Sequence, residues 1–246
     1  MAAPEDDAGE GVGPTHDLAD LMSRTARRLQ EDHGDVGSTL QAITATAIKV
    51  VPHAEDCSIS YVIGRSKVEP RASTSDLPRQ VDALQERLEQ GPCLDAVWEQ
   101  DVVRVDDVAA DDRWPDFARQ ASALGVGSMM CFQLFVQGDQ LGGLNLYGSR
   151  PGVFDDESQD IGQMFAAHAA VAVAGAEHEE NLRSAVSNRD VIGQAKGILM
   201  ERHKLTADQA FGVLARVSQE LNRKLADIAR EVSETGSVPG ADRRRN

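Results

Sequence analysis

The sequence predicts an α+β fold, in which an antiparallel sheet with flanking helices is followed by a long helix and then by a bundle of three short helices. The prediction depends on two observations. Apolar residues recur with a period of 2 in several stretches before residue 150 and with a helical period elsewhere. Gly and Pro separate these stretches, and 246 residues that are 41% hydrophobic can build one domain of about 150 residues and a smaller one.

The first half of the predicted sheet follows two helices. Leu, Val and Ile recur at helical spacing over 15–32 and 35–51, and these stretches end at Gly34 and Pro52. The period then changes to 2 over 57–64 and 67–74, which are rich in β-branched residues and predict a hairpin. Residues 1–14 are acidic and nearly without bulky apolar side chains, so we expect a disordered acidic arm there.

The second half of the sheet alternates with short helices. Helical spacing and Gly or Pro stops predict helices over 77–89, 93–99 and 113–124. Alternation predicts a strand over 102–105 and a second hairpin of strands 128–136 and 141–148. The sum is an antiparallel sheet of about five strands with helices on its faces.

A long helix is expected from Phe154 to Ser187, with Asp155 as its N-terminal cap. Residues recur along it at steps of four and three in a loose heptad: Ile161, Phe165, His168, Ala172, Gly175, Glu179, Leu182 and Val186. A heptad is typical of a helix that pairs with a second copy, so we expect a homodimer through the 154–187 helix. The alternative is a helix that only covers its own sheet.

Three short helices are expected between Arg189 and Val232. Thr206 and Gln209 form a capping box at the start of the second, and Asn222 is expected to cap the third. Apolar residues at helical spacing predict the inner faces: Ile192, Ala195, Leu199, Ala210, Leu214, Val217, Leu221, Leu225, Ile228, Ala229 and Val232. From residue 183 to 230, nine Lys and Arg face five acids, a balance of +4 in a chain of net charge −15. This is the segment least repelled by a polyanion.

Composition excludes several classes of protein. No apolar run is long enough for a transmembrane helix and the N-terminus does not resemble a signal peptide, so we expect a cytoplasmic protein without a membrane partner. Cys57, Cys93 and Cys131 are too widely spaced for a disulfide framework or a zinc site. No paired histidines, phosphate loop or nucleophile motif occurs. We therefore expect no metal, no cofactor and no catalytic residues.

The C-terminal segment resembles the ANTAR domain, an RNA-binding module of bacterial antitermination regulators. The resemblance covers VIGQAKGILMER (191–202), then T-x-x-Q-A-F-x-x-L from Thr206, then R-x-S-x-x-x-N-x-K-L-x-D-I-A from Arg216. It implies a three-helix domain over 179–236, followed by a flexible tail over 237–246. It also implies binding to paired stem-loops in a nascent transcript, so that an overlapping terminator hairpin cannot form.

With this resemblance, the basic and polar residues become candidate RNA contacts. Lys and Arg are expected at phosphates, and amides and hydroxyls at loop bases. The candidates are Arg189, Gln194, Lys196, Gly197, Met200, Arg216, Ser218, Asn222, Arg223 and Lys224. Phe211 is a further aromatic that is either core or a stacking surface. Gly193, Gly197 and Gly212 lie inside helices, where each costs about 1 kcal/mol relative to Ala, so either another helix or a nucleic-acid backbone should lie close.

Residues 15–178 resemble a GAF domain of the kind that precedes ANTAR in actinobacterial regulators. The matching pieces are GPCLDA (91–96), DDRWPDFA (111–118), GVGSMM (125–130) and LGGLNLYG (141–148). The resemblance implies a sensor domain with a ligand pocket between the sheet and the helices over it. Candidate lining residues are Tyr61, Cys93, Trp114, Phe117, Met130, Phe132, Asn145 and Tyr147. Neither the small-molecule effector or regulatory protein that it senses nor the role of Arg243–Arg245 follows from the sequence.

Two other functions remain open. A DNA-binding regulator is possible because three short helices can form a helix-turn-helix, although the third helix, which opens with NRKLADIA, has few side chains long enough to read a major groove. A thiol-dependent reductase that uses Cys93 is the third hypothesis. An RNA-binding antitermination regulator that is not an enzyme is the function that the resemblance favours.

Overall fold

The computed structural model describes residues 35–64, 67–98, 102–137 and 140–239. The acidic arm, the helix expected over 15–32 and the last residues of the tail lie outside this range. The first unit contains the following elements before the long helix: α2 (Val36–Val50), β1 (Asp56–Ile63), β2 (Lys67–Ser73), α3 (Asp76–Leu88), α4 (Pro92–Trp98), β3 (Val102–Val105), a 3₁₀ turn (Val108–Ala110), α5 (Pro115–Ala123), β4 (Ser128–Gln137) and β5 (Gln140–Gly148). They are followed by α6 (Asp156–His203), α7 (Ala207–Leu221) and α8 (Leu225–Thr235).

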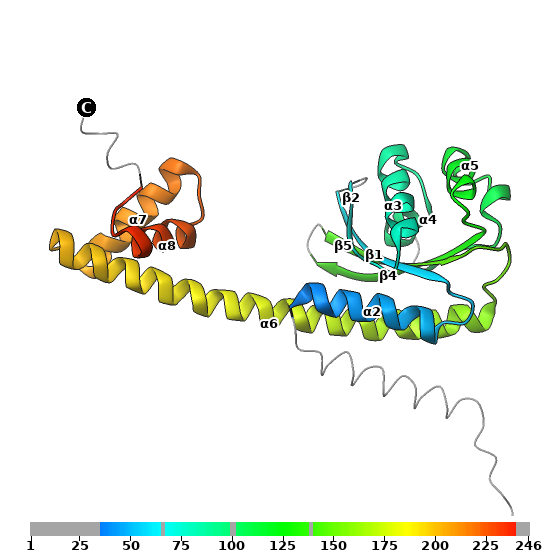
Figure 1. Ribbon diagram of the computed structural model, residues 1–246, viewed down its shortest axis with the longest axis horizontal. Helices are drawn as coiled ribbons and strands as arrows, with labels where there is room; N and C mark the ends of the chain where they lie inside the picture. Colours follow the sequence, from blue (N-terminus) through cyan, green and yellow to red (C-terminus); the bar gives the residue numbers. More distant parts are fainter. Residues whose placement is uncertain (1–34, 65–66, 99–101, 138–139, 240–246) are drawn as a thin grey trace, which may run out of the picture. The chain divides into compact units, whose positions relative to one another are not determined.

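The five strands form one antiparallel sheet in the order β2-β1-β5-β4-β3 (Figure 1). β1 pairs with β2 up to Ile63 and Lys67, and β4 pairs with β5 up to Gln137 and Gln140. Both predicted hairpins are therefore confirmed, although residues 65–66 and 138–139 of their turns lie outside the described range. The predicted α+β fold class is confirmed as well.

The sheet separates two hydrophobic cores. In Figure 1, α2 and the first turns of α6 cover one face, and α3, α4 and α5 cover the other. Strand alternation produces this division, because Cys57, Ile59 and Tyr61 of β1 belong to the core under α2 and α6, whereas Val62 belongs to the core under α3, α4 and α5. Alternate side chains of a strand point to opposite faces of the sheet, so both faces are apolar and both are covered by helices, as predicted.

The start of α6 is held close to the sheet. Asp155 accepts a hydrogen bond from the Ser158 backbone N–H at 2.8 Å, as expected for an N-terminal cap. One turn further on, a Cβ added to Gly162 would lie 2.4 Å from Cζ of Phe132 on β4. Only glycine allows this approach, so α6 packs tightly over β4.

The helix expected to end at Ser187 continues to His203. The first short helix of the bundle is therefore the last part of α6 and not a separate element. The physical reason is the lack of a break: no Pro lies between 187 and 203, and Gly193 and Gly197 weaken a helix without ending it.

The predicted heptad also divides between two faces of α6. Ile161 and Phe165 are buried against the sheet of their own chain. The large apolar residues of α6 that are exposed before the bundle are Met164, Val171, Leu182 and Val186. Leu182 and Val186 belong to the predicted heptad, as does the exposed Gly175, whereas Met164 and Val171 do not. We call these five residues the α6 stripe.

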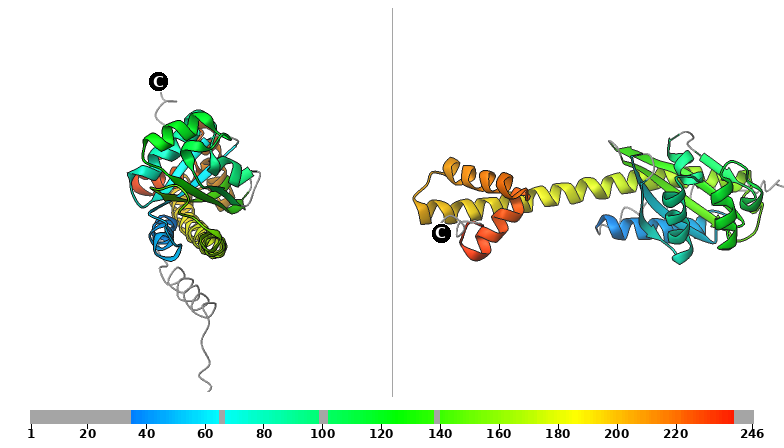
Figure 2. Two further views of the ribbon diagram at one scale, coloured as in Figure 1. Left: turned by 90° about the vertical axis from the view of Figure 1, so that its right-hand side faces the viewer. Right: turned by 90° about the horizontal axis from the view of Figure 1, so that it is seen from above.

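The chain divides into two compact units after Glu177. In the second unit, α7 and α8 pack on the last turns of α6, as Figure 2 also shows. Among the described residues, no helix has the length and apolar character needed to span a membrane.

Candidate nucleic-acid interface and sensor site

The second unit is a three-helix module with a small core. Its fully or nearly buried residues are Ala195, Leu199, Ala210, Leu214, Val217, Ile228, Ala229 and Val232. All eight belong to the predicted inner faces, of which Ile192 and Leu225 are partly buried against the same core. Leu221 is an exception, because it is 40% exposed, and the prediction that it belongs to the core was wrong. It is the last residue of α7, directly before the left-handed Asn222 that ends the helix.

The predicted capping box at the start of α7 is confirmed. The Thr206 side chain accepts from the Gln209 backbone N–H at 3.3 Å, and Gln209 Oε1 accepts from the Thr206 N–H at 2.9 Å. Both bonds satisfy N–H groups that the first turn of a helix leaves without partners. The box thereby fixes where α7 begins and which of its residues face α6.

The turn between α7 and α8 differs from the prediction. Asn222 ends α7 in the left-handed region at φ 48°, a conformation that Asn tolerates, and does not cap α8. Lys224 occupies the N-cap position of α8 without a capping hydrogen bond from its side chain. Ser218 Oγ donates to the Arg223 carbonyl at 2.6 Å, so this hydroxyl closes the turn.

The cations of the module fall into three groups. Four form ion pairs within it, namely Arg183 with Glu179, Lys204 with Glu201, Arg223 with Glu231 and Arg230 with Asp227. Arg202 donates to the Gly236 carbonyl. The remaining Lys and Arg side chains among the module's described residues form no ion pair there: Arg189, Lys196, Arg216 and Lys224. All four are predicted RNA contacts, and their charge is available to an external anion.

One pocket brings two of these cations together. It lies where α6 passes α7, has a volume of about 460 Å³, and we call it the α6–α7 pocket. Its lining consists of Ala185, Asn188, Arg189, Ile192, Gly193, Lys196 and Phe211. No acidic residue lines it, and the Phe211 ring is 43% exposed. The sequence analysis did not predict Asn188 as a site residue. The one pattern that could have indicated it is its position one helical turn before Ile192.

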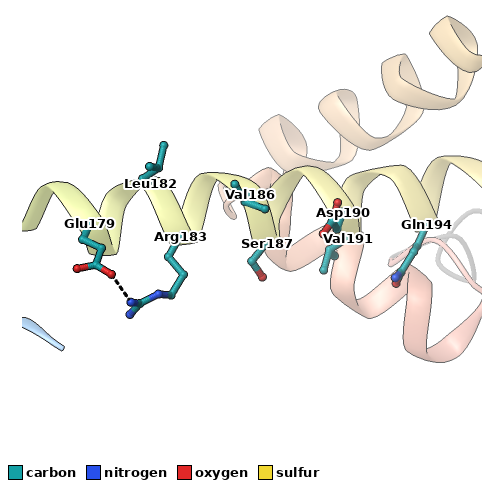
Figure 3. Close-up of a pocket in the computed structure, with 8 residues that line it drawn as sticks. All are labelled: Glu179, Leu182, Arg183, Val186, Ser187, Asp190, Val191 and Gln194. Carbon is teal, nitrogen blue, oxygen red and sulfur yellow. Dashed lines mark hydrogen bonds and ion pairs between the residues drawn. The ribbon is translucent and has the colours of Figure 1, made fainter. Parts of the chain in front are cut away.

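The other candidate contacts lie elsewhere on the module. Gln194 lines a second, shallow groove of about 660 Å³ along α6, together with Leu182, Val186 and Asp190. In Figure 3, Leu182 points to the opposite side of the helix from Arg183. Met200 is 37% exposed. The described residues thus bring Arg189 and Lys196 into one pocket and leave Gln194 and Met200 outside it.

The three helix-interior glycines have no close neighbour. A Cβ added to Gly193, Gly197 or Gly212 would meet nothing within 4 Å among the described residues. Packing of another helix of the same chain, one of the two explanations expected from the sequence, does not account for these glycines.

The eight candidate ligand residues of the first unit lie on both faces of the sheet. Tyr61, Met130 and Phe132 belong to the core under α2 and α6, and the Tyr61 hydroxyl donates to Glu177 Oε1 at 2.9 Å. The others gather on the face under α3, α4 and α5: Cys93, Trp114, Phe117, Asn145 and Tyr147. The candidates therefore belong to two separate layers, one of three residues and one of five.

That layer contains a buried carboxyl that sequence reasoning missed. Asp82 of α3 is 0% exposed, Ser60 Oγ donates to its Oδ2 at 2.6 Å, and Asn145 Nδ2 lies 3.5 Å from its Oδ1. Burial raises the pKa of Asp82 to about 6. Hydrogen bonds from Ser60, Ser58 and Tyr147 lower this pKa, but their effect is smaller than that of burial. Among the described residues, no cation pairs with it. Nearby, Asn145 Oδ1 and Gln85 Nε2 are buried without hydrogen-bond partners.

The GPCLDA segment is anchored to this layer. Gly91 has φ 142°, and a Cβ there would lie 2.4 Å from Gln85 Oε1, which accepts from the Cys93 backbone N–H at 2.9 Å. Asp95 Oδ2 accepts from Trp114 Nε1 at 3.0 Å and so joins GPCLDA to DDRWPDFA. Burial raises the pKa of Cys93 to about 12, which disfavours its thiolate form at neutral pH.

The fold resembles those of solved GAF domains. The GAF domain from a phosphoenolpyruvate-protein phosphotransferase of Coxiella burnetii is 13% identical with a TM-score of 0.53, and the match covers 69% of this chain and 99% of that one. A bacteriophytochrome of R. palustris is 12% identical with a TM-score of 0.55, and the match covers 84% of this chain and 48% of that one. At such identities the likeness shows the fold alone. No curated protein matches the sequence.

Residues 33–174 match the model of the GAF domain. The chain belongs to the GAF domain family. It also carries an ANTAR domain, since residues 180–232 match the model of that domain. The GAF domain thus contains the buried Asp82 layer, and the ANTAR domain contains the α6–α7 pocket. A GAF domain is a sensor domain and an ANTAR domain is a regulatory one, so this GAF–ANTAR chain is a signal-sensing regulator.

Proposed function

We propose that the chain is an RNA-binding transcription antitermination regulator, in which the GAF domain senses a signal and controls binding of the ANTAR domain to stem-loops in nascent transcripts. The observation that carries the proposal is the placement of the unpaired cations. In a chain of net charge −15, the ANTAR domain holds four cations, Arg189, Lys196, Arg216 and Lys224, whose side chains form neither an ion pair nor a hydrogen bond among the described residues. Such cations are the groups that RNA phosphates require.

The ANTAR helices favour RNA over duplex DNA. A helix that reads the major groove needs long basic or amide side chains on its outer surface. Helix α8 instead carries Asp227, Glu231 and Glu234 against the single cation Arg230, which is itself paired with Asp227. The unpaired cations lie on α6, on α7 and at the start of α8, an arrangement suited to a folded loop.

Binding to hairpin RNA tests the proposal. We expect the full chain to bind a pool of RNA hairpins with randomised loops more tightly than duplex DNA of the same stem sequences, as measured by fluorescence anisotropy at 0.15 M salt. Two hairpins in tandem should bind a dimer more tightly than one, by roughly 10²- to 10⁴-fold. A preference for the duplex DNA would favour a DNA-binding regulator and overturn the proposal.

A second copy is proposed to pair along the α6 stripe and so to supply the second ANTAR domain. The stripe exposes large apolar side chains: of the nine that are exposed among the described residues, four belong to the stripe. Val171, Leu182 and Val186 are more than half exposed, and open space surrounds Gly175. Large exposed apolar side chains that recur at steps of four and seven residues along one helix are typical of a surface that a partner helix covers.

Glutamate substitutions in the α6 stripe should prevent dimerisation. Leu182→Glu together with Val186→Glu places four carboxylates in the proposed interface of a dimer, so we expect sedimentation to show monomer at micromolar concentrations where the wild type is a dimer. Leu124→Glu, which alters a 37% exposed leucine after α5, is the control and should remain dimeric. A double variant that still dimerises like the wild type would remove the α6 stripe from the proposal.

The sensed signal, a small-molecule effector or a regulatory protein, is proposed to act on the layer of Cys93, Asn145 and Tyr147. Support comes from the unpartnered Asn145 Oδ1 and Gln85 Nε2 atoms, because buried polar atoms without partners are rare in proteins. The raised pKa of Cys93 disfavours thiol chemistry, so the proposed function includes no catalytic step.

A further inference from the structure

The α6–α7 pocket combines features that no other described part of the ANTAR domain shows together. Its aromatic residue, Phe211, is 43% exposed. Phe211 does not belong to the apolar core of the domain. Arg189 and Lys196 line the same pocket and form no ion pair among the described residues. Its volume of about 460 Å³ lies within the usual range for ligand sites.

We propose that this pocket takes one unpaired nucleotide of an RNA loop, with its base stacked on Phe211 and its phosphates held by Arg189 and Lys196. The inference rests on the proposed function and deepens it by naming the element of RNA that is recognised. An exposed aromatic ring beside cations suits a base, because every base has a face that stacks and a phosphate attached to it. The pocket has no carboxylate that would repel that phosphate.

Asn188 and Gly193 complete the site. The amide of Asn188 offers both a donor and an acceptor, which is what the edge of an unpaired base requires, and it makes no hydrogen bond to another described side chain. Gly193 lines the pocket with open space around the position of a Cβ. A helix-interior glycine destabilises the helix, and room for a nucleotide gives this one a reason.

Fluorescence of 2-aminopurine tests the stacking directly. The probe is a hairpin RNA selected from the randomised pool, with 2-aminopurine placed at each loop position in turn, and the protein is the full chain. We expect quenching at one loop position on binding of the wild type. Phe211→Ala should abolish the change and weaken binding roughly 5- to 150-fold, whereas Phe211→Tyr should retain both.

The control truncates an equally exposed apolar residue of the same helix. Leu221 is 40% exposed on α7 and does not line the pocket, so Leu221→Ala should bind and quench like the wild type. If the wild type binds hairpins but Phe211→Ala binds equally well with the same quenching, the pocket is not the base site and the proposed function stands. If the wild type binds no hairpin of the pool, both fail.

Gly193→Ala provides a second variant, which should retain the fold. Nothing within 4 Å meets the added methyl group, so the thermal midpoint should rise because Ala stabilises a helix interior relative to Gly. The same methyl group narrows the pocket, and we expect weaker binding of the hairpin together with reduced quenching. A variant with a higher midpoint and unchanged affinity would contradict the pocket.

Discussion

Replacement of three unpaired cations of the ANTAR domain by alanine should lower the slope of log Kobs against log salt concentration for hairpin RNA by about 2 to 3. The residues are Lys196, Arg216 and Lys224. Each phosphate contact releases counterions and contributes about 0.7 to 0.9 to the slope, so the affinity at 0.15 M salt should fall roughly 50- to 150-fold. Anisotropy titrations between 0.05 and 0.3 M salt, roughly the range used for such slopes, measure both quantities.

The ion-paired cations of the domain offer a control that removes the same charge. Arg183→Ala, Lys204→Ala and Arg230→Ala also lower the net charge by three, but these side chains already face carboxylates in the structure. We expect a much smaller change of slope for this triple variant. Equal slopes for the two triple variants would mean that only the net charge matters and that Lys196, Arg216 and Lys224 are not the phosphate contacts.

Asp82→Asn should change the free energy of unfolding of the GAF domain in a pH-dependent way. The difference between the variant and the wild type should be about 3 kcal/mol more favourable to the variant at neutral pH than at pH 4. The fold raises the pKa of Asp82 from 3.8 to about 6, chiefly through burial. The protonated carboxyl is therefore the form that the fold prefers. Its stabilisation is complete below about pH 4 and is lost as the pH rises through 6, by about 1.4 kcal/mol for each unit of the shift. Asn keeps the shape of the side chain and cannot ionise.

The measurement is the free energy of unfolding in urea at several pH values from 4 to 7.5. Trp114, which is 5% exposed in the GAF domain, reports unfolding of this domain by fluorescence. The difference between Asp82→Asn and the wild type should grow with pH and level off above 6. Asp112→Asn, which removes an exposed carboxylate of the same domain, is the control. A difference that stays constant over this range would show that Asp82 remains ionised in the folded protein at pH 4.

Local signals accounted for most of the elements. The capping box of Thr206 and Gln209 and the β4–β5 hairpin depend on residues a few positions apart, so their spacing in the sequence contains the necessary information. The end of a helix is different, because it depends on whether any residue interrupts it. The stretch after Ser187 has weak helix formers but no break, and α6 therefore continues to His203.

The candidate site was only partly accessible from the sequence. Lys and Arg could be recognised as candidates, but their pairing could not, because Arg223, in the turn before α8, meets Glu231 of α8 eight residues further on. Strand alternation separates the candidate ligand residues into two sets. Which set shares a layer with Asp82 follows only from the packing of the helices: α2 and α6 cover one face of the sheet, and α3 to α5 cover the other.

The sequence by itself determined the fold class, the order of a GAF domain before an ANTAR domain, and the excess of cations in the latter, because periodicity, motif spacing and charge are properties of neighbouring residues. Only the tertiary structure decided which cations remain unpaired, that Phe211 and Gly193 line one pocket, and that Asp82 lies buried without a cation among the described residues. Burial and pairing depend on side chains brought together from distant positions, and no local pattern records those distances.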